Sequence, residues 1–281
     1  MPPKVSTYMS APVIVAKGDD NLAYIRNLMI RHSIGRVVIV DDHNRPIGII
    51  TRKDLIRESL RQYTKPLDTI LAKDVIKGDV ITIRSNRSIK YAAKLMLKYD
   101  VSGLPVVDEN GILEGIITKT NLTRAYAEKC RGLMKVHEIM RKEVPTVHPL
   151  HTIYYVLSLI SQSDIGKVIV IDNDRPIGVI TERDVAFSLE DLNVKGRENK
   201  YRKRVGISPR GTLATIRDYI VPLAQEVMSK NIITVREDTD LSDVASLMIE
   251  NNISIIPVVD SKGFFIGAVS KTEIVKALLK M

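Results

Sequence analysis

Apolar and polar positions follow one pattern that occurs four times along this chain. In each occurrence an apolar stretch ends in Asp and a short polar turn follows; a glycine then precedes two apolar residues and Ser or Thr. The four segments are VVIVDDHNRPIGIITRKD, LPVVDENGILEGIITKTN, VIVIDNDRPIGVITERD and IPVVDSKGFFIGAVSKTE. Self-similarity of this kind is typical of repeat architectures, so the chain is predicted to contain four related repeats.

Each repeat predicts the same elements. Ahead of the two paired strands, apolar residues recur at helical spacing, as at Leu22, Ile25 and Met29 in the first repeat. A short strand is expected before that helix, and a second helix is expected after the Ser or Thr that ends the motif. The last motif residues are Thr51, Thr118, Thr181 and Ser270. Each repeat is therefore predicted as strand-helix-strand-strand-helix, an α+β unit of about 55 residues. A unit of this size buries little apolar surface and is only marginally stable alone.

The spacing of the repeats indicates an older duplication. The motif glycines are Gly48, Gly115, Gly178 and Gly267, which are 67, 63 and 89 residues apart. Repeats 1 and 3 share Arg-Pro-Ile-Gly, whereas repeats 2 and 4 share Pro-Val-Val-Asp. We interpret the chain as a two-repeat module that was duplicated, with extra residues inserted before repeat 4.

This pattern resembles the CBS domain (cystathionine beta-synthase domain) family, over residues 5–60, 70–128, 136–191 and 224–281, with an insertion at 192–223. A chain of four such repeats is most similar to the gamma subunit of AMP-activated protein kinase and to stand-alone archaeal relatives. The resemblance implies two tandem pairs, repeats 1 with 2 and 3 with 4, arranged as a compact disc. It also implies that adenine nucleotides bind in clefts between paired repeats.

The odd-numbered repeats carry the more complete set of candidate nucleotide-binding residues. Thr51 and Thr181 begin helices, where free N–H groups and the helix dipole favour a phosphate. Asp54 and Asp184 lie one turn further on, and a carboxylate can accept hydrogen bonds from both ribose hydroxyls. The alternative is that Thr-x-x-Asp only caps the helix.

The family resemblance adds two further roles in the same repeats. Arg36 and Lys167 stand at the start of a strand, where a basic residue of the kinase gamma subunit contacts phosphate. Ile49 and Val179 match the position that packs on adenine. The alternatives are ordinary exposed cations and ordinary strand core.

The even-numbered repeats depart from this pattern and give weaker candidate sites. In repeat 2 the motif is Thr118-x-x-Asn121, which lacks the charge, and in repeat 4 it is Ser270-x-x-Glu273, which also fits a capping box. The positions equivalent to Arg36 and Lys167 are Gly103 and Ile255. We therefore expect two principal sites, in the odd repeats, and empty or weak even clefts.

Charge adds one further candidate. The formal net charge is +9, and residues 195–210, KGRENKYRKRVGISPR, supply +6 of it from seven basic residues and one Glu. A basic run of this kind can follow a phosphate backbone, and Tyr201 could stack on a base. Nucleic-acid binding, with nucleotide as effector, is thus the alternative function. A lid over polyphosphate or a surface for an acidic protein is equally compatible.

Other classes of function are not supported by the sequence. There is one cysteine, Cys130, and His148 and His151 lack the partners of a metal site, so no metal is expected. No nucleophile–base pair or phosphate-binding glycine loop indicates an enzyme or a catalytic cofactor, and no apolar stretch is long enough to span a membrane. We expect a cytoplasmic regulatory protein that binds AMP, ADP or ATP and acts on a protein partner. S-Adenosylmethionine as the ligand and a homodimer as the assembly are left open.

Overall fold

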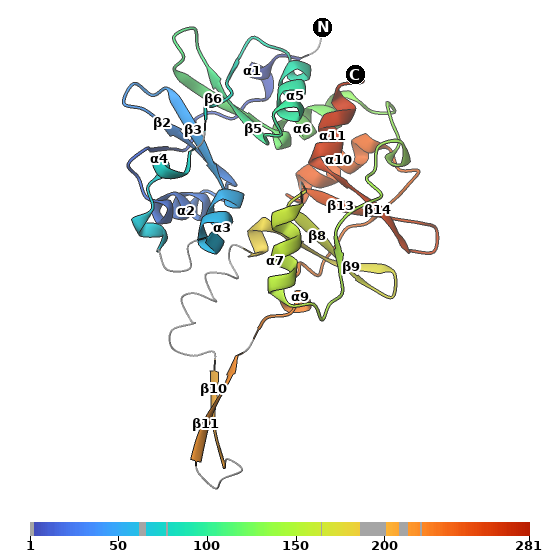
Figure 1. Cartoon of the computed structure of the whole chain (residues 1–281). Helices are drawn as coiled ribbons and strands as arrows, with labels where there is room; N and C mark the ends of the chain where they lie inside the picture. Colours follow the sequence, from blue (N-terminus) through green and yellow to red (C-terminus); the bar gives the residue numbers. More distant parts are fainter. Residues whose placement is uncertain are drawn as a thin grey trace. The chain divides into compact units, whose positions relative to one another are not determined.

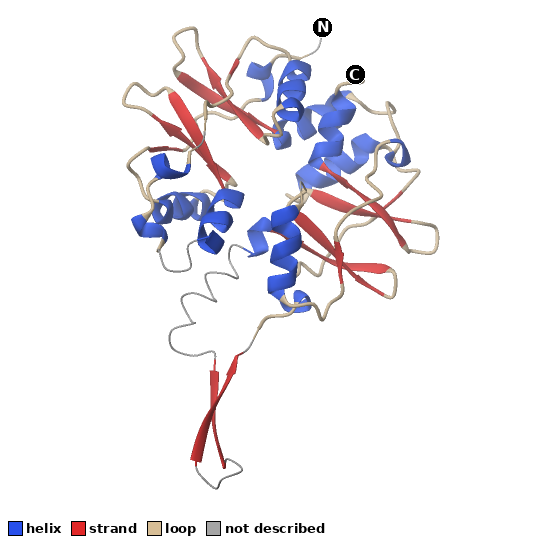
Figure 2. Ribbon diagram, in the orientation of Figure 1, coloured by secondary structure: helices blue, strands red, loops and turns tan. Residues whose placement is uncertain are grey.

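The computed structural model describes residues 3–61, 66–76, 78–163, 165–185, 201–207, 213–219 and 221–281, and shows them as short sheets flanked by helices (Figures 1 and 2). By their contacts these residues form two compact units. Unit 1 comprises residues 1–144 and 233–281, and unit 2 comprises residues 145–232. The sheets of repeats 1, 2 and 4 therefore lie in unit 1 and the sheet of repeat 3 lies in unit 2. Each unit is considered separately below.

Every repeat has the predicted order of elements. Repeat 1 contains β1 (Val15–Lys17), α2 (Leu22–Arg31), β2 (Arg36–Val40), β3 (Pro46–Thr51) and α3 (Arg52–Arg61). Repeat 2 contains β4 (Ile83–Arg84), α5 (Ile89–Lys98), β5 (Gly103–Val107), β6 (Leu113–Thr118) and α6 (Lys119–Lys129). Repeat 3 contains β7 (Thr146–Val147), α7 (Ile153–Gln162), β8 (Lys167–Asp172) and β9 (Arg175–Thr181), after which residues 182–185 are helical. Repeat 4 contains β12 (Val235–Arg236), α10 (Leu241–Glu250), β13 (Ile255–Val259), β14 (Phe265–Ser270) and α11 (Lys271–Leu278).

The sheet of each repeat has three strands with one topology. The first strand pairs in parallel with the second, and the second pairs antiparallel with the third. In repeat 1 the register places Ile39 between Ala16 and the motif glycine Gly48. The crossover between the parallel strands is the first helix, as parallel pairing requires.

The Asp that ends each central strand shapes the turn after it in three repeats. In repeat 1, Asp41 Oδ1 accepts backbone hydrogen bonds from Arg45 at 2.8 Å and His43 at 2.9 Å. These bonds, chiefly the one from Arg45, lower the pKa of the Asp41 carboxyl. Asp108 and Asp260 make the same pair of bonds in repeats 2 and 4. The recurrent Asp of the sequence pattern is therefore a turn residue.

The segment ahead of the first strand of each repeat packs on the partner repeat, and this exchange defines the two pairs. These segments contain α1 (Val5–Tyr8), α4 (Ala72–Val75), the 3-10 helix η2 (Val136–Glu138) and α9 (Ala224–Val227). A side chain added at Gly115 of repeat 2 would approach Met9 to 2.8 Å, and one at Gly48 of repeat 1 would approach Ile76 to 2.6 Å. Glycine therefore suits these motif positions, because a segment of the partner repeat crosses there and leaves no room for a side chain.

The same exchange links repeats 3 and 4. In unit 2, the segment ahead of repeat 4 packs on repeat 3, where Ser229 and Val179 form a β-bridge. In unit 1, the segment ahead of repeat 3 packs on repeat 4, where Arg141 bridges to Ala268. The structure thus confirms the predicted tandem pairs, 1 with 2 and 3 with 4, whereas the disc stays a prediction.

The core of unit 1 is continuous across repeats 2 and 4. Helix α6 packs against α10 and α11, and α5 also packs against α11. Buried residues at this interface include Leu122, Tyr126, Val244, Ile274 and Leu278. Repeat 1 has its own core, in which Leu22, Ile25 and Met29 of α2 meet Ile39 and Ile50 of the sheet. The helical stripes of the sequence therefore face these cores, as predicted.

The insertion before repeat 4 contains two strands that the sequence analysis did not expect. β10 (Tyr201–Ile207) and β11 (Leu213–Tyr219) pair antiparallel as a hairpin. Residues 186–200, 208–212 and 220, which include the remaining basic positions of the insertion, lie outside the described residues. Residues 201–207 and 213–219 of the predicted insertion therefore form paired strands.

Candidate functional site

The carboxylate of Asp54 is held in the first turn of α3. Its Oδ2 accepts hydrogen bonds from the Thr51 backbone N–H at 2.8 Å and from Thr51 Oγ1 at 2.6 Å. Its Oδ1 pairs with Arg57 Nη2 at 2.8 Å. One carboxylate oxygen therefore caps the helix, while the other lies with an exposed arginine that a ligand could displace.

Asp184 has the same local arrangement in unit 2. Its Oδ2 accepts hydrogen bonds from the Thr181 backbone N–H and from Thr181 Oγ1, both at 2.8 Å. Thr181 ends β9, so the strand fixes the position of the helix start. The two odd repeats thus place their predicted ribose acceptors in equivalent positions.

The even repeats have the same helix cap, but their capping side chains also make further contacts. Asn121 Oδ1 accepts from the Thr118 N–H at 2.8 Å and Oγ1 at 2.6 Å, and its Nδ2 donates to Ser10 Oγ at 3.1 Å. Glu273 Oε2 accepts from the Ser270 N–H at 3.0 Å and Oγ at 2.5 Å. Capping therefore occurs in all four repeats, and the ribose role of the odd carboxylates stays a prediction.

Glu273 is further covered by the segment that precedes repeat 3. Its side chain is 4% exposed, and Arg141 Nε and Lys276 Nζ each lie 3.6 Å from Oε1. That oxygen has no hydrogen bond. The acceptor of repeat 4 therefore lies beside two of the chain's own cations, and the weak site expected there stays a prediction.

Arg36 contacts the partner repeat within unit 1. Its Nη1 donates a hydrogen bond to the backbone carbonyl of Ser102. A side chain at the next residue, Gly103, would collide with the Arg36 guanidinium. The glycine that replaces a basic residue in repeat 2 thus provides room for the basic residue of repeat 1. In unit 2, Lys167 Nζ donates to the Ile165 carbonyl at 2.9 Å. The phosphate role of both cations stays a prediction.

Two lysines that the sequence analysis missed lie opposite each other at the interface of repeats 2 and 4. Lys119 Nζ donates to Thr272 Oγ1, and Lys271 Nζ donates to Thr120 Oγ1, each at 3.0 Å. Each lysine opens its second helix, directly after Thr118 or Ser270. The available signal was a basic residue after the motif Ser or Thr, which also occurs as Arg52 in repeat 1.

Lys119 is in an electrostatically unfavourable position. Burial lowers the pKa of its ammonium group, nearby Asp100 opposes this effect, and the positive charge of Arg36 lowers the pKa further. Arg36 and Lys119 are hereafter called the cationic cluster. An anion placed among these groups would offset the cost of their charge.

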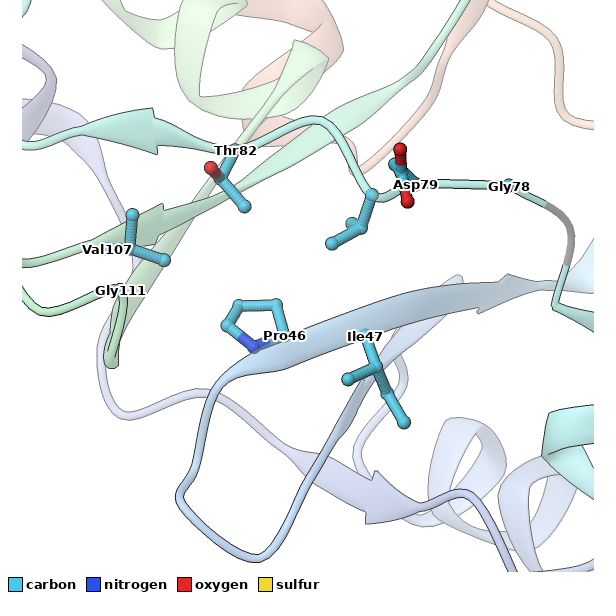
Figure 3. Close-up of a pocket in the computed structure, with 8 residues that line it drawn as sticks. Pro46, Ile47, Gly78, Asp79, Thr82, Val107 and Gly111 are labelled. Carbon is cyan, nitrogen blue, oxygen red and sulfur yellow. The ribbon is translucent and has the colours of Figure 1, made fainter.

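A pocket of about 430 Å³ lies between repeats 1 and 2 in unit 1. Figure 3 shows Pro46 and Ile47, at the start of β3, across the pocket from Thr82 and Val107 of repeat 2. Its other lining residues are Gly78, Asp79, Val80 and Gly111. The pocket combines apolar walls with one hydroxyl and one carboxylate, which suits a small ligand with an apolar face and polar edges.

The pocket and the predicted acceptors lie at opposite ends of β3. Pro46 begins that strand and Thr51 ends it, a separation of about 16 Å at the usual rise per residue. Ile49, predicted to pack on adenine, is half-buried between them, whereas Val179 in repeat 3 is buried and bridged to Ser229. The adenine-packing role of both residues stays a prediction, and Ile49 is the more exposed of the two.

The described residues contain neither a membrane-spanning helix nor a cluster of metal ligands. Among the described residues, no helix combines the length and the apolar character needed to cross a bilayer. The described part of the chain also has no group of three or more His, Cys, Asp or Glu residues that could hold a metal ion.

Comparison with known proteins places the chain among a large set of relatives. The family model described as CBS domain matches residues 5–61, 72–128, 136–191 and 224–280. A protein of Methanocaldococcus jannaschii, whose crystal structure is described as that of a candidate archaeal homologue of the AMP-activated protein kinase gamma subunit, superposes with a TM-score of 0.79 at 20% identity. The match covers 98% of this chain and 99% of that one. An uncharacterized conserved protein from Pyrococcus horikoshii gives 0.67 at 21% identity, covering 98% and 100%.

Sequence relatives with higher identity match over shorter regions. A protein of Methanopyrus kandleri with no assigned function is 37% identical over 110 residues, which are 39% of this chain and 56% of that relative. The L-aspartate semialdehyde sulfurtransferase of Methanocaldococcus jannaschii is 35% identical over 129 residues, which are 45% of this chain and 25% of the enzyme. This chain thus spans about half and about a quarter of the lengths of these two relatives.

Proposed function

Because this chain belongs to the CBS domain family, we propose that it is a regulatory protein that binds adenine nucleotides and transmits their presence to a protein partner. The observation that carries this proposal is the cationic cluster. Lys119 is held partly buried near Arg36, although burial and that positive charge both lower its pKa. A phosphate group between Arg36 and Lys119 offsets both costs.

The adenosine part of the ligand is assigned to repeats 1 and 3. In repeat 1, Asp54 Oδ1, which pairs with Arg57, is assigned to accept hydrogen bonds from the ribose hydroxyls. Ile49 is assigned to pack on the base. Thr51, whose hydroxyl donates to Asp54, and the first N–H groups of α3 are assigned to the phosphate. Lys167, Thr181 and Asp184 take the corresponding roles in repeat 3. The proposal covers AMP, ADP and ATP, with S-adenosylmethionine as the competing ligand.

Binding is tested by a thermal-shift panel on the purified chain with AMP, ADP, ATP, NAD, S-adenosylmethionine, GTP and adenosine. A ligand at a hundred times its dissociation constant stabilises the folded chain by about 2.7 kcal/mol, which is readily measured. We expect the adenine nucleotides to raise the melting temperature more than adenosine does. Equal shifts for GTP and ATP, or no shift for any nucleotide, would contradict the proposal.

The role of the cationic cluster is tested with Lys119→Met. Loss of one charge-assisted hydrogen bond should weaken ATP about ten- to a hundredfold and adenosine little. Lys129→Met is the matched control, because Lys129 is exposed at the other end of the same helix. If ATP affinity is the same in both variants, phosphate does not bind at this cluster. Phosphate release from ATP by the purified chain would contradict a purely regulatory role.

A further inference from the structure

The first helix of repeat 2, α5, lies in a stretch of the chain that carries only positive charge (Figure 1). Residues 80–99, which contain β4, α5 and the turn between them, have five basic residues and no Asp or Glu. The equivalent helices differ, because α7 has no charged residue and α10 has two acidic ones. The fold of the repeat therefore does not require the positive charge of α5.

Most of these cations have no acidic partner. Four of them are exposed, and none of the four forms an ion pair within the described part of the chain: Arg84, Arg87, Lys94 and Lys98. The fifth, Lys90, donates to the backbone carbonyl of Met281 at 2.9 Å. Lys90, Lys94 and Lys98 follow one another at a spacing of four residues, and like charges at this spacing destabilise a helix. An anion bound along this face would relieve that repulsion.

Two half-exposed tyrosines stand among the cations. Tyr91 is 43% exposed, and the guanidinium carbon of Arg87 lies 5.6 Å from the centre of its ring. Tyr99 is 44% exposed, and Lys98 Nζ lies 5.0 Å from the centre of its ring. Lys94 lies about one helical turn from both Tyr91 and Lys98, on the same face of α5. The surface therefore presents two pairs of a cation and an aromatic ring, with a further cation between them.

This alternation of cations and rings indicates which polyanion fits the surface. Single-stranded nucleic acid supplies phosphates for the cations and bases that stack on the rings. An acidic polypeptide would satisfy the cations, but its carboxylates offer nothing that stacks on a tyrosine. In a duplex the bases stack on one another, so they are not available to the rings.

We infer that this surface, here called the α5 face, binds single-stranded nucleic acid. The α5 face consists of Arg87, Tyr91, Lys94, Lys98 and Tyr99. Its three cations contact phosphates, and its two tyrosines stack on the adjoining bases. The α5 face shares no residue with the cationic cluster or with the candidate nucleotide-binding residues, so the inference is independent of the proposed function. It is also independent of the basic stretch at 195–210.

The test measures fluorescence anisotropy of a labelled 20-nucleotide single strand with the full chain, between 50 and 200 mM salt. In Lys94→Gln/Lys98→Gln, we expect about a tenfold weaker affinity at 50 mM salt, and a slope of log K against log salt that is shallower by about 1.4, since two phosphate contacts are lost. The matched control is Lys142→Gln/Lys262→Gln, which removes the same charge from two exposed positions outside repeat 2. Because distant charges are screened, the control should weaken binding less than about threefold. Equal losses in the two variants would mean that only net charge matters, which would overturn the assignment to the α5 face.

A second variant tests stacking separately from charge. Tyr91→Leu/Tyr99→Leu should weaken binding of the single strand about tenfold and leave the salt slope unchanged. An affinity equal to that of wild type would overturn the role of the tyrosines.

Three results with wild type alone would also overturn the inference, whatever the stability of the variants. The first is no binding of the single strand at 50 mM salt. The second is equal affinity for a duplex of the same sequence, which would overturn the choice of a single strand. The third is equally effective competition by polyglutamate of the same total charge, which would favour an acidic polypeptide as the partner.

Discussion

The guanidinium of Arg141 lies 3.6 Å from the carboxylate of Glu273, measured from Nε to Oε1. Arg141 belongs to the segment ahead of repeat 3, whereas Glu273 occupies the acceptor position of repeat 4 in the same unit. Glu273 is buried, and Lys276 Nζ lies at the same distance from the same carboxylate oxygen. The arginine thus occupies the position that a ligand takes in the odd repeats according to our proposal.

We predict that Arg141→Met lowers the free energy of unfolding by about 1–3 kcal/mol, because it removes one of the two cations beside a buried carboxylate. Adding Glu273→Gln should restore part of the loss, since the amide carries no charge. Urea denaturation of the single and double variants measures both effects. The control is Lys142→Met, an exposed neighbour that should change the stability by less than about 0.5 kcal/mol. A similar loss in Lys142→Met would refute the role of the pair.

Asp54→Asn separates capping from nucleotide binding. Asn121 shows that an amide at this position keeps the cap, so the stability of the variant should be close to that of wild type. The loss of the carboxylate should weaken nucleotide binding to repeat 1 about ten- to a hundredfold. Isothermal titration should then report one strong site fewer. An unchanged titration would leave Asp54 with capping as its only role. Asp184→Asn is the parallel test for repeat 3.

Gly103→Ala should weaken nucleotide binding although Gly103 carries no charge. The added methyl group would displace the Arg36 guanidinium from its position beside Ser102. We expect about a tenfold weaker affinity for AMP, and little further loss when Gly103→Ala is combined with Arg36→Ala. Calorimetry of the two single variants and the double variant completes the cycle. Additive losses would mean that Gly103 acts independently of Arg36.

Lys119 predicts a pH dependence of stability in the ligand-free chain. Burial lowers the pKa of this lysine below its ordinary value of 10.5, so the folded chain binds the proton more weakly than the unfolded chain. The resulting penalty is complete at pH values below the folded pKa and is lost as the pH rises from the folded pKa to 10.5. Lys119→Met should therefore be more stable than wild type at pH 7, and the difference should shrink near pH 10.

The measurement is urea denaturation of wild type, Lys119→Met and Lys129→Met at pH 7, 9 and 10 without ligand. Saturating ATP at pH 7 should then reverse the order of wild type and Lys119→Met, because only wild type gains the phosphate contact. A difference between wild type and Lys119→Met that is independent of pH would show that the loss of packing, and not charge, determines the effect.

The fold was predictable because its determinants are local. The turn after β2 needs only Asp41 and the two backbone N–H groups, within the next four residues, that donate hydrogen bonds to its carboxylate. The helical stripe at Leu22, Ile25 and Met29 likewise lies within one element. These local patterns recur four times, and the resulting membership of the CBS domain family is confirmed by the matching family model.

The features that the sequence did not reveal connect distant parts of the chain. The hydrogen bond from Lys119 to Thr272 joins residues 153 positions apart, and that from Asn121 to Ser10 joins residues 111 positions apart. No local pattern specifies such partners. The hairpin is a different case, because its second strand, Leu213–Tyr219, shows neither a strict apolar-polar alternation nor the basic run that marks the first strand.

The exchange of segments between paired repeats also limits how many repeats such a chain can gain or lose during evolution. The third strand of each repeat is overlaid by residues encoded ahead of its partner, as Ile76 overlies Gly48 and Met9 overlies Gly115. Deletion of one repeat would therefore expose the sheet of another, whereas deletion of a whole pair would remove both halves of each exchange. The heritable unit of this architecture is the pair, and lineages that carry an odd number of these repeats need some other segment to complete the last one.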